Sequence, residues 1–393
     1  MRTLERGFAC DVLVVGAGPV GLTAAVLLSR AGLEVTVIDR RPGPVTQSRA
    51  TDLHARTLEA LAPSGLADML LPVGRRVRAV DIWSARRRLG GFGTAESRSA
   101  YPYILTVPQC ATEGVLCQEA ERSGVAVHRV TAVRSLREDT SGVTVVTDRQ
   151  GALRARYVVA ADGASSTLRH LTGVAFRGHS HPGVWALADL EVRASSLPLD
   201  RIHMVSGPRG LLVVLPMHLD GWARVVVHHP FTRGREDRLP WQDGPSPALI
   251  VSEAEARGWN VTWSGCRWVS TFRTHCRLAS PGDSARVILI GDAAHVCSPV
   301  GGQGLNLGLR DAVTLSSLLR DTAPHTQARL ATWKRARRAE ALHVLARTHA
   351  ATAVWNLRSA PAAALRDRAL QGLLSVRSGR RLFAEAVAGP RSG

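Results

Sequence analysis

The chain has 393 residues, 45% of them apolar, and a formal net charge of +18 at pH 7. This length predicts two domains with substantial cores, and the apolar content excludes a disordered tail. No apolar stretch is long enough to cross a bilayer, and Asp11 and Gly16 interrupt the run that a secretion signal would need. We therefore expect a globular protein with no membrane partner.

The positive charge is spread along the chain rather than gathered in one block. Lys334 is the only lysine, so nearly all basic residues are arginines. A nucleic-acid binder clusters such side chains to neutralise phosphates. The densest run, 333–340, is better explained as the solvated face of a helix. We expect no nucleic-acid partner, with a polyanion as the weaker alternative.

The six cysteines form no Cys-x-x-Cys pair, and no histidine stands at metal-ligand spacing from them. We therefore expect no metal. Reduced thiols are typical of a cytoplasmic protein, and we expect that location.

The first predicted strand runs into a Gly-x-Gly-x-x-Gly turn at Gly16, Gly18 and Gly21. The strand before the turn is predicted at 12–15. A helix at 22–30 and a second strand at 34–39 are predicted after it. In such a turn the first glycine permits the tight bend, the second lets a pyrophosphate approach, and the third allows close packing. Asp39 is placed to accept hydrogen bonds from a ribose. The pattern predicts an ADP site; the alternative is a structural turn with Asp39 as a strand-end cap.

The middle of the chain continues the α/β pattern. Residues 107–130 predict a turn, a helix capped through Thr112, and a strand. A hairpin around 148–151 then leads to a buried strand, 157–161. Asp162 and Gly163 follow that strand at its carboxyl end, where open α/β sheets bind ligands.

A second glycine-rich turn occurs after another apolar strand. The strand near Ile288 precedes Gly291 and Asp292, and the turn from Gly301 to Gly304 leads into a long helix that we expect to start near Leu305. The positive end of a helix attracts anions, so the chain has a second place to receive negative charge.

Between Phe176 and Arg277 the pattern changes to alternating strands, which predict an antiparallel sheet able to cover a ligand. A helix with Ser246 as cap and Pro247 at its first position interrupts them. Six side chains are candidates to line an aromatic substrate pocket, with the alternative that each belongs to the core: Trp185, Met204, Trp222, Trp263, Trp268 and Phe272. Four histidines are candidates to bind or deprotonate a phenol: His203, His228, His229 and His275. The sequence does not single out one of them as general base. From Pro324 onward, helices are expected across the back of both domains.

Three motifs in this order resemble those of the flavin-dependent aromatic hydroxylases. These are the single-component FAD monooxygenases typified by p-hydroxybenzoate hydroxylase and by the aromatic polyketide and rifampicin hydroxylases of actinomycetes. The resemblance runs from about Cys10 to at least Leu319. The motifs are the turn at Gly16, Gly18 and Gly21, "DGASSTLR" with Asp162, Gly163 and Arg169, and "GDAAH" with Gly291 and Asp292.

The resemblance implies a set of FAD contacts. Asp39 would bind the adenosine ribose, Arg49 and Gln109 would contact the cofactor, and Asp292 would bind the ribityl chain. Asp162 would lie behind both FAD and pyridine-nucleotide contacts. The other implied contacts are Gly16, Gly18, Gly21, Gly163, Gly291, Pro299, Gly302, Gly304, Leu305 and Asn306. The family usually has two prolines after the Gly-Asp motif; here Ser298 replaces the first and Pro299 keeps the second.

The implied fold is α/β, with a Rossmann-like FAD-binding domain and an interleaved antiparallel-sheet substrate domain. We expect the FAD-binding domain over 1–75, 101–175 and 280–323, and the substrate domain over 76–100 and 176–279. A C-terminal helical segment would occupy 324–393, without the thioredoxin-like third domain of some relatives.

The implied activity is an FAD monooxygenase. NADPH or NADH would reduce FAD, and a flavin C4a-hydroperoxide formed from O2 would transfer one oxygen atom to an aromatic, polyketide-type substrate. Such chemistry belongs to the cofactor, which agrees with the lack of a nucleophilic triad or metal cluster in the sequence. Baeyer-Villiger oxidation or epoxidation, an antibiotic-inactivating hydroxylase, and a non-catalytic FAD-binding relative stay open, as does the choice between monomer and homodimer.

Overall fold

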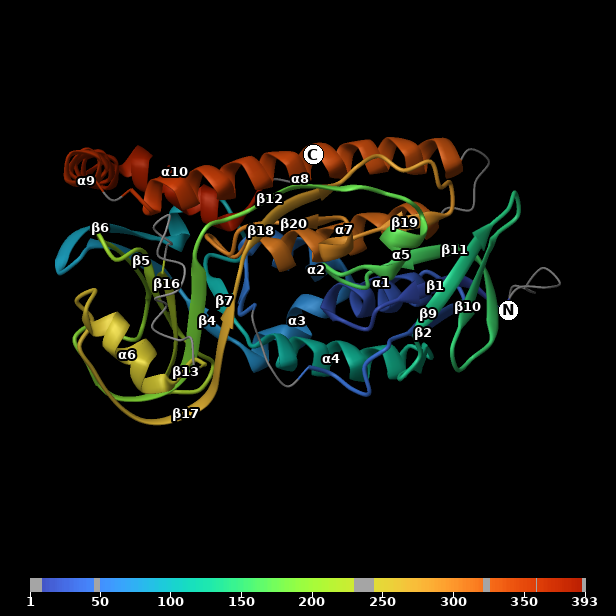
Figure 1. The fold of residues 1–393 in the computed structure, drawn as a ribbon, viewed down its shortest axis with the longest axis horizontal. Helices are drawn as coiled ribbons and strands as arrows, with labels where there is room; N and C mark the ends of the chain where they lie inside the picture. Colours follow the sequence, from blue (N-terminus) through green and yellow to red (C-terminus); the bar gives the residue numbers. More distant parts are fainter. Residues whose placement is uncertain (1–8, 46–49, 230–243, 321–325, 358, 391–393) are drawn as a thin grey trace.

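Two large β-sheets form the molecule, and a long C-terminal helix runs above both of them (Figure 1). The computed structural model describes residues 9–45, 50–229, 244–320, 326–357 and 359–390. Within these ranges no helix combines the length and the apolar composition needed to cross a bilayer.

The first sheet has the strand order β8, β2, β1, β11, β10, β9, and β19 also pairs with β11. Strands β8, β2, β1, β11 and β19 run parallel, whereas the hairpin of β9 and β10 is antiparallel to β11. The strands are β1 (Cys10–Val15), β2 (Val35–Ile38), β8 (Ala126–His128), β9 (Val133–Glu138), β10 (Val143–Thr147), β11 (Ala152–Ala160) and β19 (Val287–Leu289). The carboxyl ends of the parallel strands therefore lie along one edge.

Helices cover one face of this sheet. Apolar side chains of α1 (Pro19–Arg30), α4 (Gln109–Arg122) and α7 (Gln303–Arg320) share a single buried cluster with β1 and β2. On the other face, β9 and β10 pack with Leu168 of the short helix α5 (Thr167–Leu171). Burial on both faces explains why the parallel strands have nearly continuous apolar sequences.

Two predicted helix starts were wrong by a few residues. Helix α1 begins at Pro19, three residues earlier than predicted, because proline suits the first helical position. Helix α4 begins at Gln109, so Thr112 lies inside it and is not its cap; the Thr112 hydroxyl donates to the carbonyl oxygen of Pro108 instead.

The second sheet has the order β17, β13, β16, β15, β14, β5, β6, and only the β14–β5 pair is parallel. Its strands are β5 (Ala79–Ser84), β6 (Arg87–Gly93), β13 (Val184–Ser195), β14 (Ile202–Ser206), β15 (Leu212–Pro216), β16 (Trp222–His229) and β17 (Val261–Phe272). Helix α6 (Pro247–Glu255) packs on one face, and its Ser246 cap accepts a hydrogen bond from the amide of Leu249, as predicted.

Two three-stranded sheets lie beside the large ones. One joins β12 (Phe176–Ser180), β18 (His275–Ala279) and β20 (His295–Val296); the other joins β3 (Asp52–Leu53), β7 (Ile104–Thr106) and β4 (Arg75–Val77). Short helices α2 (Ala55–Leu61) and α3 (Leu66–Leu70) follow β3.

Helix α8 (Thr326–Trp355) spans both halves of the fold. It packs on α7 and β18, and its last residue, Trp355, joins the core cluster of the second sheet. That cluster also includes residues of α9 (Ala360–Ser375) and α10 (Arg377–Ala388), which cover the β6 side. The predicted fold class, a Rossmann-like α/β domain with an interleaved antiparallel sheet and C-terminal helices, is confirmed; the domain boundaries stay a prediction.

Candidate functional site

The first glycine turn connects β1 to α1 at the carboxyl edge of the first sheet. Gly16 has φ +107°, and a Cβ there would overlap the carbonyl oxygen of Ala161. A Cβ at Gly21 would overlap the carbonyl oxygen of Gly16. Packing alone therefore requires glycine at both positions.

Gly18 differs from these two glycines. Among the described residues, a Cβ at Gly18 would meet nothing nearer than a guanidinium nitrogen of Arg41, at 3.9 Å. Gly18 is also the N-cap of the twelve-residue helix α1, whose first turn has neither a side-chain cap nor an acidic residue. An open approach to the positive end of a helix suits a phosphate group.

Asp39 directly follows β2, beside this turn, and is buried. Its carboxylate accepts hydrogen bonds from the amide of Ala17 at 2.6 Å and from the amide of Arg41 at 2.7 Å, and it pairs with the Arg41 guanidinium at 3.2 Å. Burial raises the pKa of Asp39, but these hydrogen bonds outweigh burial and the pKa is lowered overall. Arg41 was not predicted as a site residue, although it stands only two residues after Asp39.

Another predicted contact, Gln109, lies at the start of α4. The amide group of Gln109 donates to Glu113 at 3.0 Å, and the buried Glu113 also accepts from the amide of Val45 at 3.0 Å. Arg49 lies outside the described residues, so its predicted flavin contact stays a prediction.

The Asp-Gly motif shapes the turn after β11. Asp162 accepts from the hydroxyl of Ser166 and from the amide of Leu168 at 3.1 Å, which secures the start of α5. Arg169 donates to the carbonyl oxygen of Ala293 at 2.9 Å. The motif thus connects the end of β11 to the turn after β19, and Gly163 adopts φ +83° between them.

Asp292 lies in the turn after β19 and has no hydrogen bond or ion pair with any of the described residues. Its side chain is accessible to solvent, yet protein surrounds it closely enough to raise the pKa of the carboxyl group by desolvation, an effect that His295 opposes. An accessible carboxylate without a protein partner is an acceptor available to ligand hydroxyl groups.

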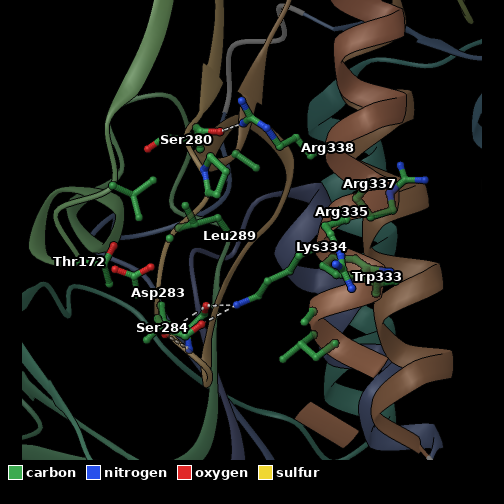
Figure 2. Close-up of a pocket in the computed structure, with 18 of the residues that line it drawn as sticks. Thr172, Ser280, Asp283, Ser284, Leu289, Trp333, Lys334, Arg335, Arg337 and Arg338 are labelled. Carbon is green, nitrogen blue, oxygen red and sulfur yellow. Dashed lines mark hydrogen bonds between the residues drawn. The ribbon is translucent and has the colours of Figure 1, made fainter. Parts of the chain in front are cut away.

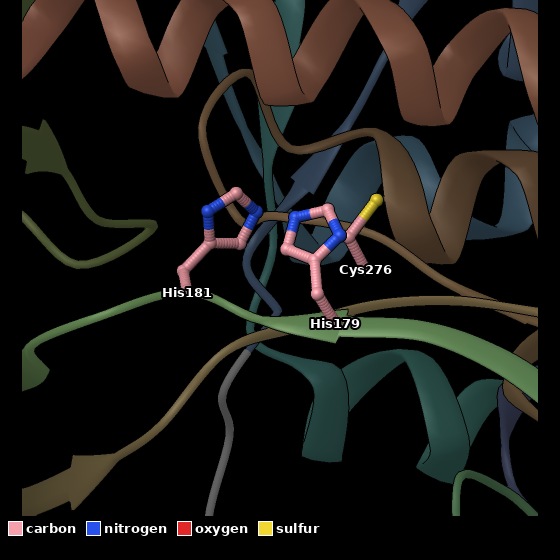
Figure 3. Close-up of side chains that lie close together, drawn as sticks. All are labelled: His179, His181 and Cys276. Carbon is pink, nitrogen blue, oxygen red and sulfur yellow. The ribbon is translucent and has the colours of Figure 1, made fainter.

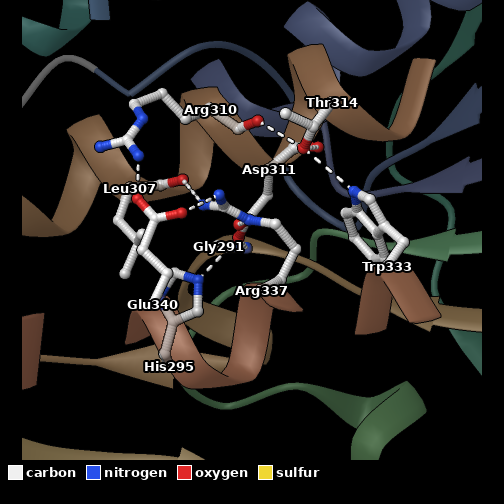
Figure 4. Close-up of polar contacts among 9 residues, drawn as sticks. All are labelled: Gly291, His295, Leu307, Arg310, Asp311, Thr314, Trp333, Arg337 and Glu340. Carbon is white, nitrogen blue, oxygen red and sulfur yellow. Dashed lines mark hydrogen bonds and ion pairs between the residues drawn. The ribbon is translucent and has the colours of Figure 1, made fainter. Parts of the chain in front are cut away.

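A buried polar network supports this turn from the side of α7 and α8 (Figure 4). Asp311 accepts from the amide of Gly291 at 3.0 Å and from Arg337 at 2.7 Å, and it contacts His295 at 2.6 Å. Burial raises the pKa of Asp311, but His295, Arg337 and Gly291 outweigh it, so the carboxylate stays ionised. The network fixes Gly291 and hence the position of Asp292.

Replacing Asp311 is expected to destabilise the protein. Asp311→Asn removes the negative charge between His295 and Arg337, and buried groups left poorly paired cost about 2 kcal/mol of unfolding free energy. Urea unfolding of the apoprotein would measure the change. An unchanged free energy of unfolding would contradict the supporting role of the network.

The second glycine turn leads into α7, which begins at Gln303, two residues earlier than predicted. Gly302 has φ +61°, and a Cβ there would overlap a carboxylate oxygen of Asp52. Asn306 is buried; its amide nitrogen donates to the carbonyl oxygens of Asp52 and Gly302 at 2.9 and 2.7 Å, and its oxygen accepts from His54. The side chain of Asn306 is therefore engaged by protein groups. We expect Asn306 to affect ligand binding by holding this turn in position.

The remaining predicted residues of this segment have simpler surroundings. The carbonyl oxygen of Pro299 accepts from the amide of Gly302 at 2.9 Å and closes the turn. Gly304 and Leu305 lie in the first turn of α7, and a Cβ at Gly304 would lie 3.5 Å from the sulfur of Cys297. The sequence analysis missed the contact between Asp52 and His54, whose side chains approach to 3.0 Å beside Gly302.

Ser298, where the family usually has proline, is fully buried, and its hydroxyl accepts a long hydrogen bond, 3.4 Å, from the amide of Val300 in the turn. The hydroxyl lies 2.7 Å from that of Thr352 on α8. We expect Ser298→Ala to lower the unfolding free energy by about 1–2 kcal/mol, because the hydrogen bond to Thr352 and the longer one from the amide of Val300 are both lost. Thermal unfolding would measure this; since Thr352 keeps its bond to the carbonyl oxygen of Thr348, a much larger loss would contradict the assignment.

A family model described as "FAD binding domain" matches residues 9–348 of the chain. The chain belongs to this family. Rifampicin monooxygenase of Streptomyces venezuelae is 39% identical over 316 residues, covering 78% of this chain and 63% of the relative. The 6-methylpretetramide 4-monooxygenase of Streptomyces rimosus is 34% identical over 390 residues, covering 98% and 69%. The chain thus spans about two thirds of the length of these curated relatives.

A solved relative has the same fold. The Diels-Alderase PyrE3 of the biosynthetic pathway of pyrroindomycins is 26% identical, with a TM-score of 0.80, covering 97% of this chain and 80% of that one. The resemblance seen in the sequence is confirmed by the family match, and so is FAD as the cofactor of the family.

In this member of the FAD-binding family, the second sheet presents one face toward the turn at 299–302. Trp185 of β13 stacks near Phe272 of β17, and both belong to a buried cluster that includes Val300. On the same face, Arg224 of β16 forms a buried ion pair with Asp189 at 2.7 Å. We call this surface, with Trp185, Asp189, Arg224 and Phe272, the inner face.

The other aromatic candidates have different surroundings. Trp263 packs in the cluster on the α6 side, so it does not line the inner face. Met204 packs against the cluster of Trp185. The ring of Trp222 lies against Arg267, and that of Trp268 against Arg224.

None of the considered histidines is assigned as general base. His203 is buried, accepts from the indole of Trp83 at 3.1 Å, and contacts the carbonyl oxygen of Pro198 at 2.7 Å. His228 lies 2.8 Å from the amide oxygen of Asn356, and His275 lies 2.8 Å from the hydroxyl of Ser180. His229 ends β16.

A cavity of about 500 Å³ lies between α8 and the segment 278–289 (Figure 2). Lys334 reaches across it and donates to the carbonyl oxygens of Ser284 and Val287 at 2.8 and 3.2 Å. Its lining contains none of the predicted site residues, so it is separate from the expected FAD site.

Proposed function

We propose that this chain is an FAD-dependent monooxygenase that places one oxygen atom of O2 on an aromatic substrate, with NADPH or NADH as electron donor. One observation carries the proposal. In the part of the chain that the structure describes, Gly18 leaves an open approach and the Asp292 carboxylate has no partner, and both follow strands at the carboxyl edge of one sheet. The approach at Gly18 suits a phosphate group, and the Asp292 carboxylate suits hydroxyl groups. FAD offers both, because it contains a pyrophosphate and a ribityl chain.

The residues of this chain would divide the binding of FAD between them. The first-turn amides of α1 would hold the pyrophosphate, because Gly18 leaves that approach open. Asp292 would accept hydrogen bonds from the ribityl hydroxyls. The first-turn amides of α7 would stabilise negative charge on the reduced ring, by about 1 kcal/mol. Asp39 would orient the adenosine side together with Arg41.

Bound FAD would supply the redox chemistry and the activation of O2. The protein would contribute position and exclusion of water. The inner face would bind the aromatic substrate, with Trp185 and Phe272 as stacking surface. The indole nitrogen of Trp185 is buried without a hydrogen-bond partner among the described residues, and we propose that it donates to a substrate oxygen.

The relatives favour a polycyclic, polyketide-type substrate, since one of them is named for 6-methylpretetramide. Biosynthetic tailoring and antibiotic inactivation both agree with such a substrate. A cytoplasmic location and a monomeric or homodimeric state complete the proposal.

The purified protein should be yellow and show the absorbance spectrum of bound FAD. NADPH oxidation would then be measured against polycyclic phenols, quinones and rifamycin-like compounds, with mass analysis of the products. We expect one compound to stimulate oxidation and to gain one oxygen atom; the carbon modified distinguishes hydroxylation from ring insertion or epoxidation. A protein that cannot be reconstituted with FAD would contradict the proposal.

A second candidate function has support from the similarity to PyrE3, a Diels-Alderase. In that case FAD would shape the site without being reduced, and substrate would rearrange with no change of mass and no NADPH consumed. Conversion that proceeds equally well without NADPH and without O2 would favour this second candidate over the monooxygenase.

A further inference from the structure

Three side chains with metal-binding atoms, none of them assigned to FAD, meet beneath α8. They are His179 of β12, His181 just after it, and Cys276 of β18 (Figure 3). One nitrogen of each histidine and the sulfur of Cys276 lie within 4.8 Å of one another.

The strand geometry explains this meeting. His179 and Cys276 are directly opposite in the antiparallel pair of β12 and β18, so their side chains share a face. His181 follows two residues after His179 and therefore projects to the same side. His349 of α8 approaches from above, with its Nδ1 3.1 Å from the Nε2 of His179.

One atom of the cluster lacks a protein partner. His181 is only 8% exposed, and its buried Nε2 makes no hydrogen bond with any residue in the described part of the chain. A buried polar atom left in this state destabilises a fold, and such an atom needs an explanation such as an ion. Its ring lies 5.2 Å from that of His349 and 5.0 Å from that of His179, so the unpaired nitrogen belongs to a group of imidazoles.

We propose that His179, His181 and Cys276 bind a Zn²⁺ ion, with His349 as the fourth ligand. Imidazole nitrogen and thiolate sulfur are the donors that zinc prefers in four-coordinate sites. Bonds of about 2.0–2.3 Å in a tetrahedron place the donor atoms about 3.5 Å apart. The present spacing requires the donors to move together by about 1 Å, and His179 and His349 are exposed and free to turn toward the ion.

Zinc binding would release the thiol proton of Cys276 and connect β12 and β18 to α8. These elements lie between the two large sheets, since β12 leads directly into β13 and β18 pairs with β20 before the turn at 299–302. The ion would therefore stabilise the junction of the two sheets. This inference does not depend on the proposed monooxygenase function.

The test uses the full-length, tag-free protein, stripped of metal with a chelator and desalted. Titration with ZnCl2 against a chromogenic chelator should show one ion bound per chain, and zinc should raise the Tm by several degrees. Substitution with Co²⁺ should give a thiolate-to-metal charge-transfer band. A wild-type protein that binds no zinc in competition with the chelator would overturn the proposal.

Two variants locate the ion. Cys276→Ser should abolish the charge-transfer band and weaken zinc binding by at least about 100-fold, as loss of a primary ligand exceeds the usual effect of losing an outer-shell partner. His179→Ala, at an exposed position that leaves the core intact, should weaken it similarly. Matched controls are Cys266→Ser in the second sheet and His343→Ala on the exposed side of α8. Wild-type zinc affinity in both ligand variants would refute the site.

Discussion

Gly18→Val is expected to abolish FAD binding while leaving the apoprotein folded. Gly18 has φ −81° and ψ 179°, which valine adopts readily, and the nearest described atom to a Cβ at this position is the end of the flexible Arg41 side chain, at 3.9 Å. The branched side chain would instead occupy the approach to the first turn of α1. We expect the Kd for FAD to rise at least about 1,000-fold, because a blocked pyrophosphate loses its bonds to the helix amides.

Flavin absorbance per chain after desalting, together with the Tm of the apoprotein, would measure both parts of this result. Gly21→Ala is the contrasting variant: its Cβ would overlap the carbonyl oxygen of Gly16, so we expect it to lower the Tm as well. Stoichiometric FAD in Gly18→Val would show that the pyrophosphate lies elsewhere.

The sequence was informative where a requirement is local. The glycine spacing at Gly16, Gly18 and Gly21 predicted the turn, since Gly16 and Gly21 are each crowded by backbone of the same strand–turn–helix unit or of the adjacent strand. The proline at position 19 also allowed an earlier helix start than the one we predicted, because helix ends depend on single residues. Strand β14 was not predicted; it has only five residues, and besides the neighbouring β15 it pairs with β5, more than a hundred residues away.

Contacts between segments far apart in the chain could not be predicted from the sequence. Asn306 was predicted to contact the cofactor, but its side chain is engaged by His54 and Asp52, some 250 residues earlier in the chain. The histidine and cysteine cluster was missed for the same reason: His179 and His349 are separated by 170 residues and meet only because α8 covers β18. Ser298 looked like a turn substitution, and only the structure shows its bond to Thr352.

Asp292→Ala is expected to weaken FAD binding without destabilising the apoprotein. The carboxylate has no hydrogen bond or ion pair with the described residues, so its removal leaves no protein group unpaired. Desolvation raises its pKa, which means that folding favours the protonated acid; any stability it contributes is present at low pH and lost as pH rises through the folded-state pKa. At neutral pH the apoprotein therefore loses nothing with the carboxylate, and its Tm should be unchanged or slightly higher.

In contrast to the stability of the apoprotein, the binding of FAD should be weakened by Asp292→Ala. A charged acceptor contributes about 1.5–3 kcal/mol per hydrogen bond, so losing Asp292 should raise the Kd for FAD by about 100-fold. Fluorescence titration of apoprotein with FAD would give the Kd, and thermal unfolding with and without FAD would separate binding from folding. Asp311→Asn is the matched control, because it should lower apoprotein stability through Gly291. An Asp292→Ala variant that keeps wild-type affinity would show that the ligand hydroxyls bind elsewhere, whereas one that unfolds would show that the carboxylate supports the turn itself.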